Sequence, residues 1–466
     1  MSVDTEHKEY TDNIGTWEKI DDICDANNVD QYLLTLNPTD PSKEMEARNL
    51  AYRNRAIFYQ VAGYTSSGML GMIFAKKPVL VVPDSMDYMT YNANGSGLSI
   101  YQLSQMTARE VIRKSRAGLF VSFPDTGGVV SQADMDSGGI FSTIHHISAD
   151  QIINWGEMLV GSRMMLSFVV IKEEVEEEGD DKFDVDVVDQ RRVLSLEDGV
   201  FVISLYRKND SGDWIIYGEP KVPLDGGGNK WNEIPFVFVG ADNNDSCVDE
   251  PYMKGLVDLN IGHFRNSADW EESVWFCGQP QPWMSGITQE HLDLMSKNNM
   301  YFGCAHLVGV PSGETLGIVQ ADPNPVVRQA MIDKIDMMVG MGARYIQPNS
   351  STKTATEAEG DQKSQHSILS TISENVSSAY TKASMFAARY MSEPEDDVLY
   401  ATTTDFVAKT ATAQELQAVI GAFIQGALPP GDYFAWLQSR GLVAEEKTID
   451  EFLEDVGRVR MPNLGE

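Results

Sequence analysis

Histidines and acidic residues are the side chains of this sequence whose spacing could build a metal site. His145 and His146 are adjacent in a stretch that reads as a strand, where neighbouring side chains point to opposite faces. This favours a pair at the edge of a core over a zinc site, whose ligands must converge. The acidic run at residues 173–181 does not place the glycine and the final glutamate as a calcium-binding EF-hand loop requires. We interpret it as a solvated hairpin tip.

Motifs of nucleophilic, hydrolytic and nucleotide chemistry are absent from the sequence. It contains no GxSxG, no HExxH, no GxxxxGK[ST] and no GxGxxG after a strand. The segment GVPSG at residues 309–313 resembles a nucleophile elbow, but Pro311 takes the central position. We therefore expect no enzyme, no catalytic residue, no cofactor and no metal. The alternative is an acidic, metal-dependent hydrolase that uses the Asp and Glu clusters.

The composition limits the classes of function. The 466 residues, 42% of them hydrophobic, can bury a large core and suggest roughly two to four domains. With 36 basic and 69 acidic residues, the formal net charge is -33. Such a surface repels phosphate, so reading nucleic acid is not the expected main activity. An acidic wall would nevertheless let DNA slide past without gripping it.

Cysteines and apolar runs give no sign of secretion or membrane insertion. Cys24, Cys247, Cys277 and Cys304 are isolated, which favours a reduced, intracellular protein over a disulfide framework. The first residues lack the basic start and apolar run of a signal peptide. The apolar stretch 68–82 falls short of the roughly 20 residues that a membrane-spanning helix needs. We expect no targeting segment and no membrane partner.

The first half of the chain alternates helices with strands. Apolar spacing predicts a helix over residues 44–74, with Gly63 and Gly68 as points of interruption. A second helix is predicted over 99–114, because Ser99 and Gln102 have the spacing of a capping box. The remaining expected elements are strands at 79–82 and 117–123, four strands of an antiparallel meander from 164 to 219, and one more strand at 234–239 that extends the meander.

The second half is predicted to be mainly helical. Helices over 250–276 and 326–345 flank an irregular, proline-rich unit at 278–325 that holds one helix at 288–298. A polar loop at 347–354 precedes one long helix over 356–391. Shorter helices are expected at 413–427, 432–440 and 447–456.

The long helix has the pattern of a scaffold. One apolar stripe runs along it: Ile368, Ile372, Val376, Ala379, Ala383, Phe386 and Tyr390. The other face carries small serines that leave room for a closely packed neighbour, which we expect to be an identical copy: Ser364, Ser367, Ser370, Ser377 and Ser378. Thr354 and Glu357 have capping-box spacing, so the acid is predicted to cap the helix rather than to catalyse.

Two basic residues next to the polar loop are unusual in so acidic a chain. Arg344 lies just before the loop, and Lys353 lies within it. Ordinary surface charge and contact with DNA phosphates explain them equally well on the residues alone.

Residues 352–358, TKTATEA, resemble the K-T-A-T-E signature of tailed-bacteriophage portal proteins, with Lys353, Thr354, Ala355, Thr356 and Glu357 at the matching positions. Earlier segments follow in the order of one portal subfamily long filed as a domain of unknown function: residues 53–56 (RNRA), 71–74 (GMIF), 77–78 (KP), 97–100 (GLSI) and 117–124 (AGLFVSFP). The resemblance covers nearly the whole chain.

The resemblance implies an α+β, portal-like subunit. Its parts would be an α/β wing at 1–249, stem helices at 250–277 and 326–346, a small irregular clip at 278–325, a tunnel loop at 347–355, a long wing helix and return strand at 356–408, and a helical crown at 409–466. The residues facing DNA in the tunnel would be Arg344, Gln347, Asn349 and Lys353.

The resemblance also implies a function and partners. Portal proteins form a homo-oligomeric ring, usually of twelve subunits, at one capsid vertex of the virion, and they assemble in the host cytoplasm. Viral double-stranded DNA enters and leaves through the ring, which contacts the terminase motor, the tail adaptor, and capsid and scaffolding proteins. The alternative within structural proteins is another head-tail adaptor or a tail ring.

Overall fold

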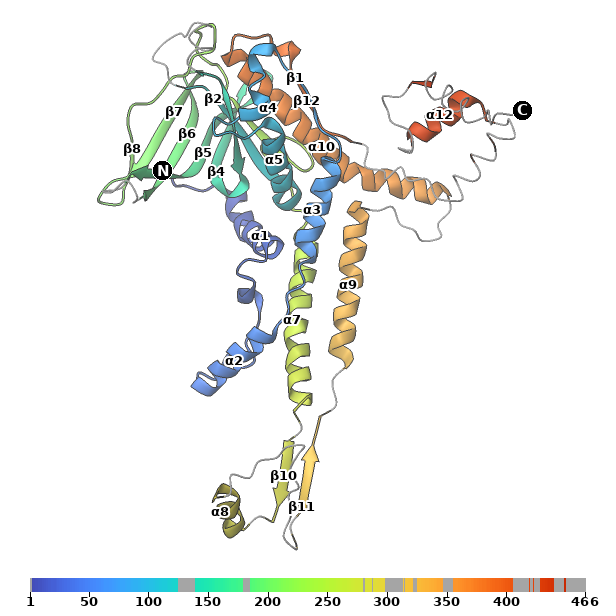
Figure 1. Ribbon diagram of the computed structural model, residues 1–466. Helices are drawn as coiled ribbons and strands as arrows, with labels where there is room; N and C mark the ends of the chain where they lie inside the picture. Colours follow the sequence, from blue (N-terminus) through green and yellow to red (C-terminus); the bar gives the residue numbers. More distant parts are fainter. Residues whose placement is uncertain are drawn as a thin grey trace, which may run out of the picture. The chain divides into compact units, whose positions relative to one another are not determined.

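The computed structural model describes residues 2–124, 139–178, 185–279, 281–286, 288–297, 313, 315–321, 325–346, 355–404, 419, 422, 428–439 and 448–449, with the backbone alone at 281, 291, 294–295, 343–346 and 355–367. The chain divides into two compact units, Met1–Thr404 and Asp405–Glu466. The predicted α+β class is confirmed (Figure 1). No helix within the described ranges is long and apolar enough to span a membrane.

A three-stranded antiparallel sheet forms the centre of the first unit. Its order is β3 (Thr143–Ser148), β2 (Arg116–Ser122) and β9 (Phe236–Gly240). Helices α5 (Ile100–Lys114) and α10 (Ala355–Tyr390) pack against it. The expectation that the strand near 234–239 extends the meander is wrong. Every residue of β9 is buried, so it suits a sheet covered on both faces rather than one open to water.

The predicted antiparallel meander is confirmed and has an additional strand. The sheet runs in the order β4 (Ile152–Val160), β5 (Arg163–Glu178), β6 (Val185–Glu197), β7 (Val200–Lys208) and β8 (Trp214–Ile216). Asp198 and Gly199 join β6 to β7 with φ of 52° and 76°. These positive angles fit the two-residue hairpin turns that match strand twist.

The single helix predicted over 44–74 is instead two helices, α2 (Lys43–Arg55) and α3 (Val61–Ile73). The break lies at 56–60 rather than at a glycine. Side chains of another helix bind the backbone there: Ser267 accepts from the Ile57 N–H at 3.0 Å, and Asn260 accepts from the N–H groups of Val61 and Ala62, both at 3.0 Å. These contacts cap α3 from outside its own sequence.

Several short elements complete the first unit. The capping box predicted for Ser99 and Gln102 is confirmed at the start of α5. Strand β1 pairs antiparallel with β12 in a separate two-stranded ribbon. The remaining bounds are α1 (Lys8–Asp25), η1 (Val29–Tyr32), β1 (Val79–Val81), η2 (Asp84–Met86), α4 (Met89–Asn92), η3 (Ala149–Gln151), η4 (Glu395–Asp397) and β12 (Leu399–Ala401).

Two long helices flank a small distal unit, as the sequence predicts. They are α7 (Lys254–Cys277) and α9 (Pro325–Ile346). Between them lie β10 (Gln281–Ser285), α8 (Gln289–Lys297) and β11 (Thr315–Val319), and the two strands pair antiparallel. Helix α8 was predicted, whereas the strand pair was not. Figure 1 shows β10 and β11 continuing from the ends of the two helices.

The second unit is described only in part. Its helix α12 (Pro430–Ser439) agrees with the helix predicted over 432–440. Phe434 and Leu437 of α12 are buried, and Tyr433 and Trp436 pack beside them. The helices predicted over 413–427 and 447–456 lie outside the described residues.

Candidate functional site

The two neighbouring histidines of β3 are hydrogen-bonded parts of the core. Nε2 of His145 lies 2.9 Å from Oγ1 of Thr143, and Nδ1 of His146 lies 3.0 Å from Oγ1 of Thr107. Burial lowers the pKa of both rings, that of His146 to about 4, so both are neutral at pH 7. Across the described residues, no group of three or more His, Cys, Asp or Glu side chains could hold a metal ion.

The acidic run of β5 is partly neutralised by arginines on β6, the adjacent strand, and on β7, the next strand beyond it. Glu173 pairs with Nε of Arg192 on β6 at 2.6 Å, and Glu177 pairs with Nη1 of Arg207 on β7, also at 2.6 Å. Cross-strand pairs of opposite charge stabilise a sheet modestly. Residues 173–178 of the run are paired residues of strand β5 rather than the tip of the hairpin, and residues 179–181 lie outside the described ranges.

Helices α7 and α9 form a closely packed antiparallel pair. A Cβ atom at Gly255 would lie 2.9 Å from Cε of Met341, and one at Gly262 would lie 3.1 Å from Cε of Lys334. The start of α7 therefore faces the end of α9. Nζ of Lys334 also donates to Oδ1 of Asn266 at 2.6 Å. Small residues on α7 let the backbones approach, and polar contacts fix the register.

The N-terminal elements anchor α7 along much of its length. Tyr52 of α2 donates to Asp269 at 2.7 Å, and Arg55 pairs with Glu272. Nearer the start of α7, Lys19 of α1 pairs with Asp258 at 2.7 Å. Together with the cap that Asn260 provides to α3, these contacts cover one side of α7 with the rest of its own chain.

His263 lies buried in α7 without a hydrogen-bond partner among the described residues. Neither ring nitrogen is paired, and the ring of Tyr59 lies 6.0 Å away between centroids. Burial, aided by the nearby Lys334, lowers its pKa, so the ring is neutral at pH 7. A neutral ring suits the apolar contact between α7 and α3.

The helix pair and the distal unit between its helices expose large apolar side chains. Ile318 of β11 is 67% exposed, and Phe276 at the end of α7 is 54% exposed. The other exposed members of this surface, called the distal apolar surface below, are Val274, Trp275, Trp283, Leu292, Val319, Ile332, Met337 and Val339. An apolar surface of this extent marks an interaction site. Sequence patterning could not identify it, because apolar residues on a helix are normally assigned to the core.

Of the DNA-facing residues predicted from the resemblance, the structure describes only the backbone of Arg344 and does not describe the others. Arg344 belongs to the last turn of α9, but only its backbone is described. Gln347, Asn349, Lys353 and Thr354 lie outside the described residues. The remaining signature residues Ala355, Thr356 and Glu357 begin α10, again as backbone alone. Their roles remain predictions.

The small residues of α10 bind the chain's own return segment. Ser373 donates to the carbonyl of Thr403 at 2.7 Å, and Ser377 accepts from the N–H of Thr402 at 2.9 Å. Ser370 donates to the carbonyl of Thr404 at 3.2 Å. The expectation that Ser370 and Ser377 leave room for an identical copy is therefore wrong, because residues 402–404 occupy that space. The predicted apolar stripe is confirmed as buried from Ile372 onward.

One comparison with known proteins matches the part of the chain that contains the helix pair α7 and α9. A family model described only as a domain of unknown function (DUF4055) matches residues 252–391, which contain all of α7, the distal unit, α9 and α10. No curated protein matches the chain.

Two solved structures give weak likenesses. One comes from the virion of a native gene transfer agent particle, at 11% identity and a TM-score of 0.40, covering 82% of this chain and 90% of that one. The other comes from the neck of an empty gene transfer agent particle computed with C6 symmetry, at 11% identity and a TM-score of 0.39, covering 79% and 87%. TM-scores below 0.5 carry no argument about this chain.

Proposed function

We propose that this chain is a portal protein, a structural subunit of the ring at one capsid vertex through which viral double-stranded DNA is packaged and ejected. The observation that carries the proposal is the antiparallel pair α7 and α9 with the distal unit between them and an uncovered apolar surface along both. Identical copies arranged around an axis would cover that surface, because each copy meets its neighbours through the same two faces.

The parts of the chain take roles in this proposal. Helices α7 and α9 serve as the stem, the β10–α8–β11 unit as the clip that docks the packaging motor and the tail adaptor, and residues 347–355 as the tunnel loop. The 22 residues of α9 rise about 33 Å, a suitable length for a channel wall. The meander and central sheet serve as the wing, and residues 409–466 as the crown. Catalysis has no part in this role.

The charge of the chain supports passage of DNA without tight binding. An excess of acidic residues repels phosphate along the channel, and a few basic groups at its narrowest point hold the duplex near the axis. Arg344, just before the polar loop at residues 347–354, and Lys353, within that loop, are the residues proposed for this contact.

Imaging and packaging assays test the proposal at two levels. Electron microscopy of the purified protein should show rings with a central hole, and twelve subunits in each ring are expected. Replacing both Arg344 and Lys353 by alanine should reduce DNA packaging or retention while rings still form. Arg328→Ala, near the opposite end of the same helix α9, is the matched control and should package normally.

Each failure has a separate meaning. A protein that stays monomeric under every condition, including inside assembled particles, would contradict the portal role. Rings that form and package DNA normally after both substitutions would leave the ring intact and remove Arg344 and Lys353 from the site. Rings that lie at the tail rather than at the capsid vertex would identify a tail component instead.

A further inference from the structure

The hairpin between β4 and β5 ends in an exposed apolar tip. Gly161 and Ser162 form its two-residue turn, with φ of +63° at Gly161. Leu159 is 68% exposed and pairs across the hairpin with Met164, which is 58% exposed. Met158 and Val160 are also exposed. A soluble chain has little reason to place four large apolar side chains together at a protruding turn unless a partner covers them.

One basic residue accompanies the apolar tip. Arg163 is exposed and pairs in register with Val160, so both side chains lie on one face of the hairpin. Within the described residues, Arg163 has no ion pair or hydrogen bond from its side chain. The hairpin tip, defined here as residues 158–164, thus combines apolar area with one available positive charge.

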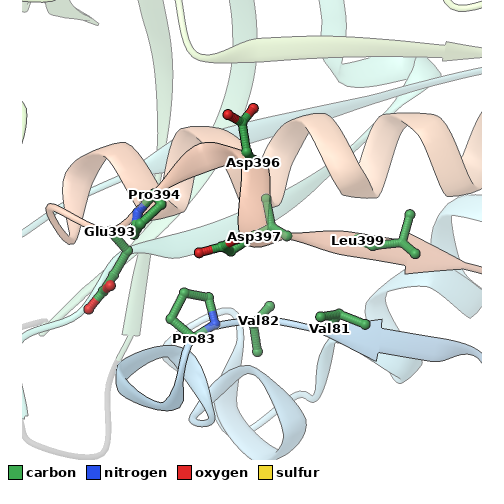
Figure 2. Close-up of a pocket in the computed structure, with 9 residues that line it drawn as sticks. Val81, Val82, Pro83, Glu393, Pro394, Asp396, Asp397 and Leu399 are labelled. Carbon is green, nitrogen blue, oxygen red and sulfur yellow. The ribbon is translucent and has the colours of Figure 1, made fainter.

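A complementary hollow lies beside the β1–β12 ribbon. It has a volume of about 540 Å³ and is walled by Val81, Val82 and Pro83 on one side and by residues 393–394 and 396–399 on the other. Val398 forms a buried part of the lining, whereas Leu399 and Val81 are each about half exposed. Figure 2 shows these apolar side chains on the two facing segments.

The hollow also contains available negative charge. In Figure 2 the carboxylate of Asp397 lies on the side of Glu393 and faces Pro83, whereas the carboxylate of Asp396 points away from Pro83 and Val82. Glu393 already accepts a hydrogen bond from Ser85 at 2.7 Å. No partner binds the carboxylate of Asp397 in the part of the chain that the structure describes.

We propose that the hairpin tip of one copy inserts into this hollow on the next copy, with Arg163 paired to Asp397. The proposal rests on the ring proposed above, and it names a subunit contact outside the helix pair. The two surfaces match in chemistry, since both contain apolar side chains, the tip carries the positive charge of Arg163 and the hollow carries negative charge that includes Asp397. They are different places on one chain, which is the condition for a head-to-tail contact that closes into a ring.

The arrangement of the elements favours a neighbouring copy as the occupant. In Figure 1 the five-stranded sheet and the β1–β12 ribbon lie on opposite sides of α5, so the tip cannot reach the hollow of its own chain without unfolding. A small ligand is less suited to the site, because small-molecule pockets bury most of the ligand's surface and here half of Val81 and Leu399 is open.

Charge exchange tests the contact in the full-length protein. Arg163→Glu should raise the protein concentration needed for half-maximal ring formation about 3-fold or more, as loss and reversal of one interfacial pair would do. Asp397→Arg should do the same, and the double variant should restore assembly toward the original value. Asp396→Arg is the matched control: Asp396 also lines the hollow, but its carboxylate points away from Pro83 and Val82, so the variant should neither weaken assembly as strongly nor rescue Arg163→Glu.

Cross-linking gives a readout that does not depend on affinity. One chain carries Leu159→Cys, and a second chain, distinguished by a tag of different length, carries Leu399→Cys. The two chains are assembled together and then either oxidised or treated with a short bismaleimide. A covalent heterodimer that neither variant forms alone supports the contact. The unmodified chain, which carries Cys24, Cys247, Cys277 and Cys304, sets the background.

The outcomes separate the two proposals. Rings that form without a heterodimer and without charge rescue would overturn the hairpin contact while leaving the portal role in place. Absence of rings for the unmodified chain would overturn both. A heterodimer that forms equally well in monomeric protein at low concentration would show random collision, and it would also contradict the proposed contact.

Discussion

The long helix α10 and the pair α7–α9 both contain many apolar side chains, but those of α10 are largely buried and many of those in the pair are exposed. In α10, buried residues occur on nearly every face from Leu369 to Met391, because the central sheet, α5 and the return segment all pack on it. In the helix pair, Met338 and Ile261 are buried, whereas Met337 and Val339, on either side of Met338, belong to the exposed distal apolar surface. The first region is completed by its own chain, and the second is not.

This difference distinguishes residues that stabilise one subunit from residues that are available to join several. Substitutions in α10 should act on the free energy of unfolding of a single chain. Substitutions on the distal apolar surface should leave that free energy unchanged and act on assembly. The following predictions test this division in order of decreasing effect.

The largest effect is expected from Phe386→Ala in α10. Phe386 is 3% exposed and its ring meets that of Trp231 at 5.8 Å. The cavity should lower the free energy of unfolding by about 3–5 kcal/mol. Chemical denaturation of the unassembled protein measures it. A change below 1 kcal/mol would mean that α10 is not part of the core.

A pH-dependent effect is expected from His146, which links to α10 through Thr107 and Tyr380. Burial, then the charge of Lys114, lowers its pKa from 6.5 to about 4 in the folded protein. The unfolded chain therefore binds more protons between these values, and the contribution to stability is complete above pH 6.5 and lost as the pH falls toward 4.

The size of this contribution is about 3 kcal/mol. His146→Gln keeps a polar group but cannot titrate, so its stability should vary less with pH between 6.5 and 4 than that of the original protein. Denaturation midpoints measured across this range give the two slopes. Parallel slopes would show that His146 does not supply the acid sensitivity.

A smaller effect is expected from Asn260→Ala, in the half of α7 that its own chain covers. The substitution leaves the N–H groups of Val61 and Ala62 without their acceptor and should cost about 1–3 kcal/mol. Asn266→Ala, one and a half turns later, removes only the half-exposed contact with Lys334 and should cost at most about 1 kcal/mol. Equal losses would contradict the assigned cap.

The smallest effect on stability is expected from Met337→Ala. Met337 is 56% exposed, and its neighbour Met338 is fully buried. Met337→Ala should change the free energy of unfolding by less than about 0.5 kcal/mol but weaken ring formation, whereas Met338→Ala should cost about 2–5 kcal/mol. For both variants, sedimentation measures ring formation and chemical denaturation measures the free energy of unfolding. Equal destabilisation would erase the distinction between the two regions.

Local patterns predicted most of the elements but not their partners. The capping box at Ser99, the meander and the helix over 250–276 follow from signals within a few residues. The break at 56–60 could not be predicted, since Asn260 and Ser267, about 200 residues away, stabilise it. The assignment of β9 to the central sheet likewise depends on which surfaces are covered on both sides.

The sequence predicted the order of the elements that form the candidate site, but not which of their residues are exposed. The sequence indicated two helices around an irregular unit, and the structure contains them. Which of their apolar residues remain exposed depends on where α1, α2 and α3 end along α7, and periodicity alone does not contain that information. The serines of α10 show the converse. The resemblance implied a return strand within residues 356–408, but the serine spacing did not indicate that residues 402–404 bind these serines.

The external cap of α3 also has a mechanical consequence. Asn260 and Ser267 of α7 hold the backbone at Ile57, within the α2–α3 break, and at the first two residues of α3 through hydrogen bonds. A slide of α7 by one turn, about 5.4 Å, would break all of them together. An axial pull on the distal unit would therefore load all of these hydrogen bonds at the same time. The part of α7 from Asn260 to Ser267 would resist the pull as one unit.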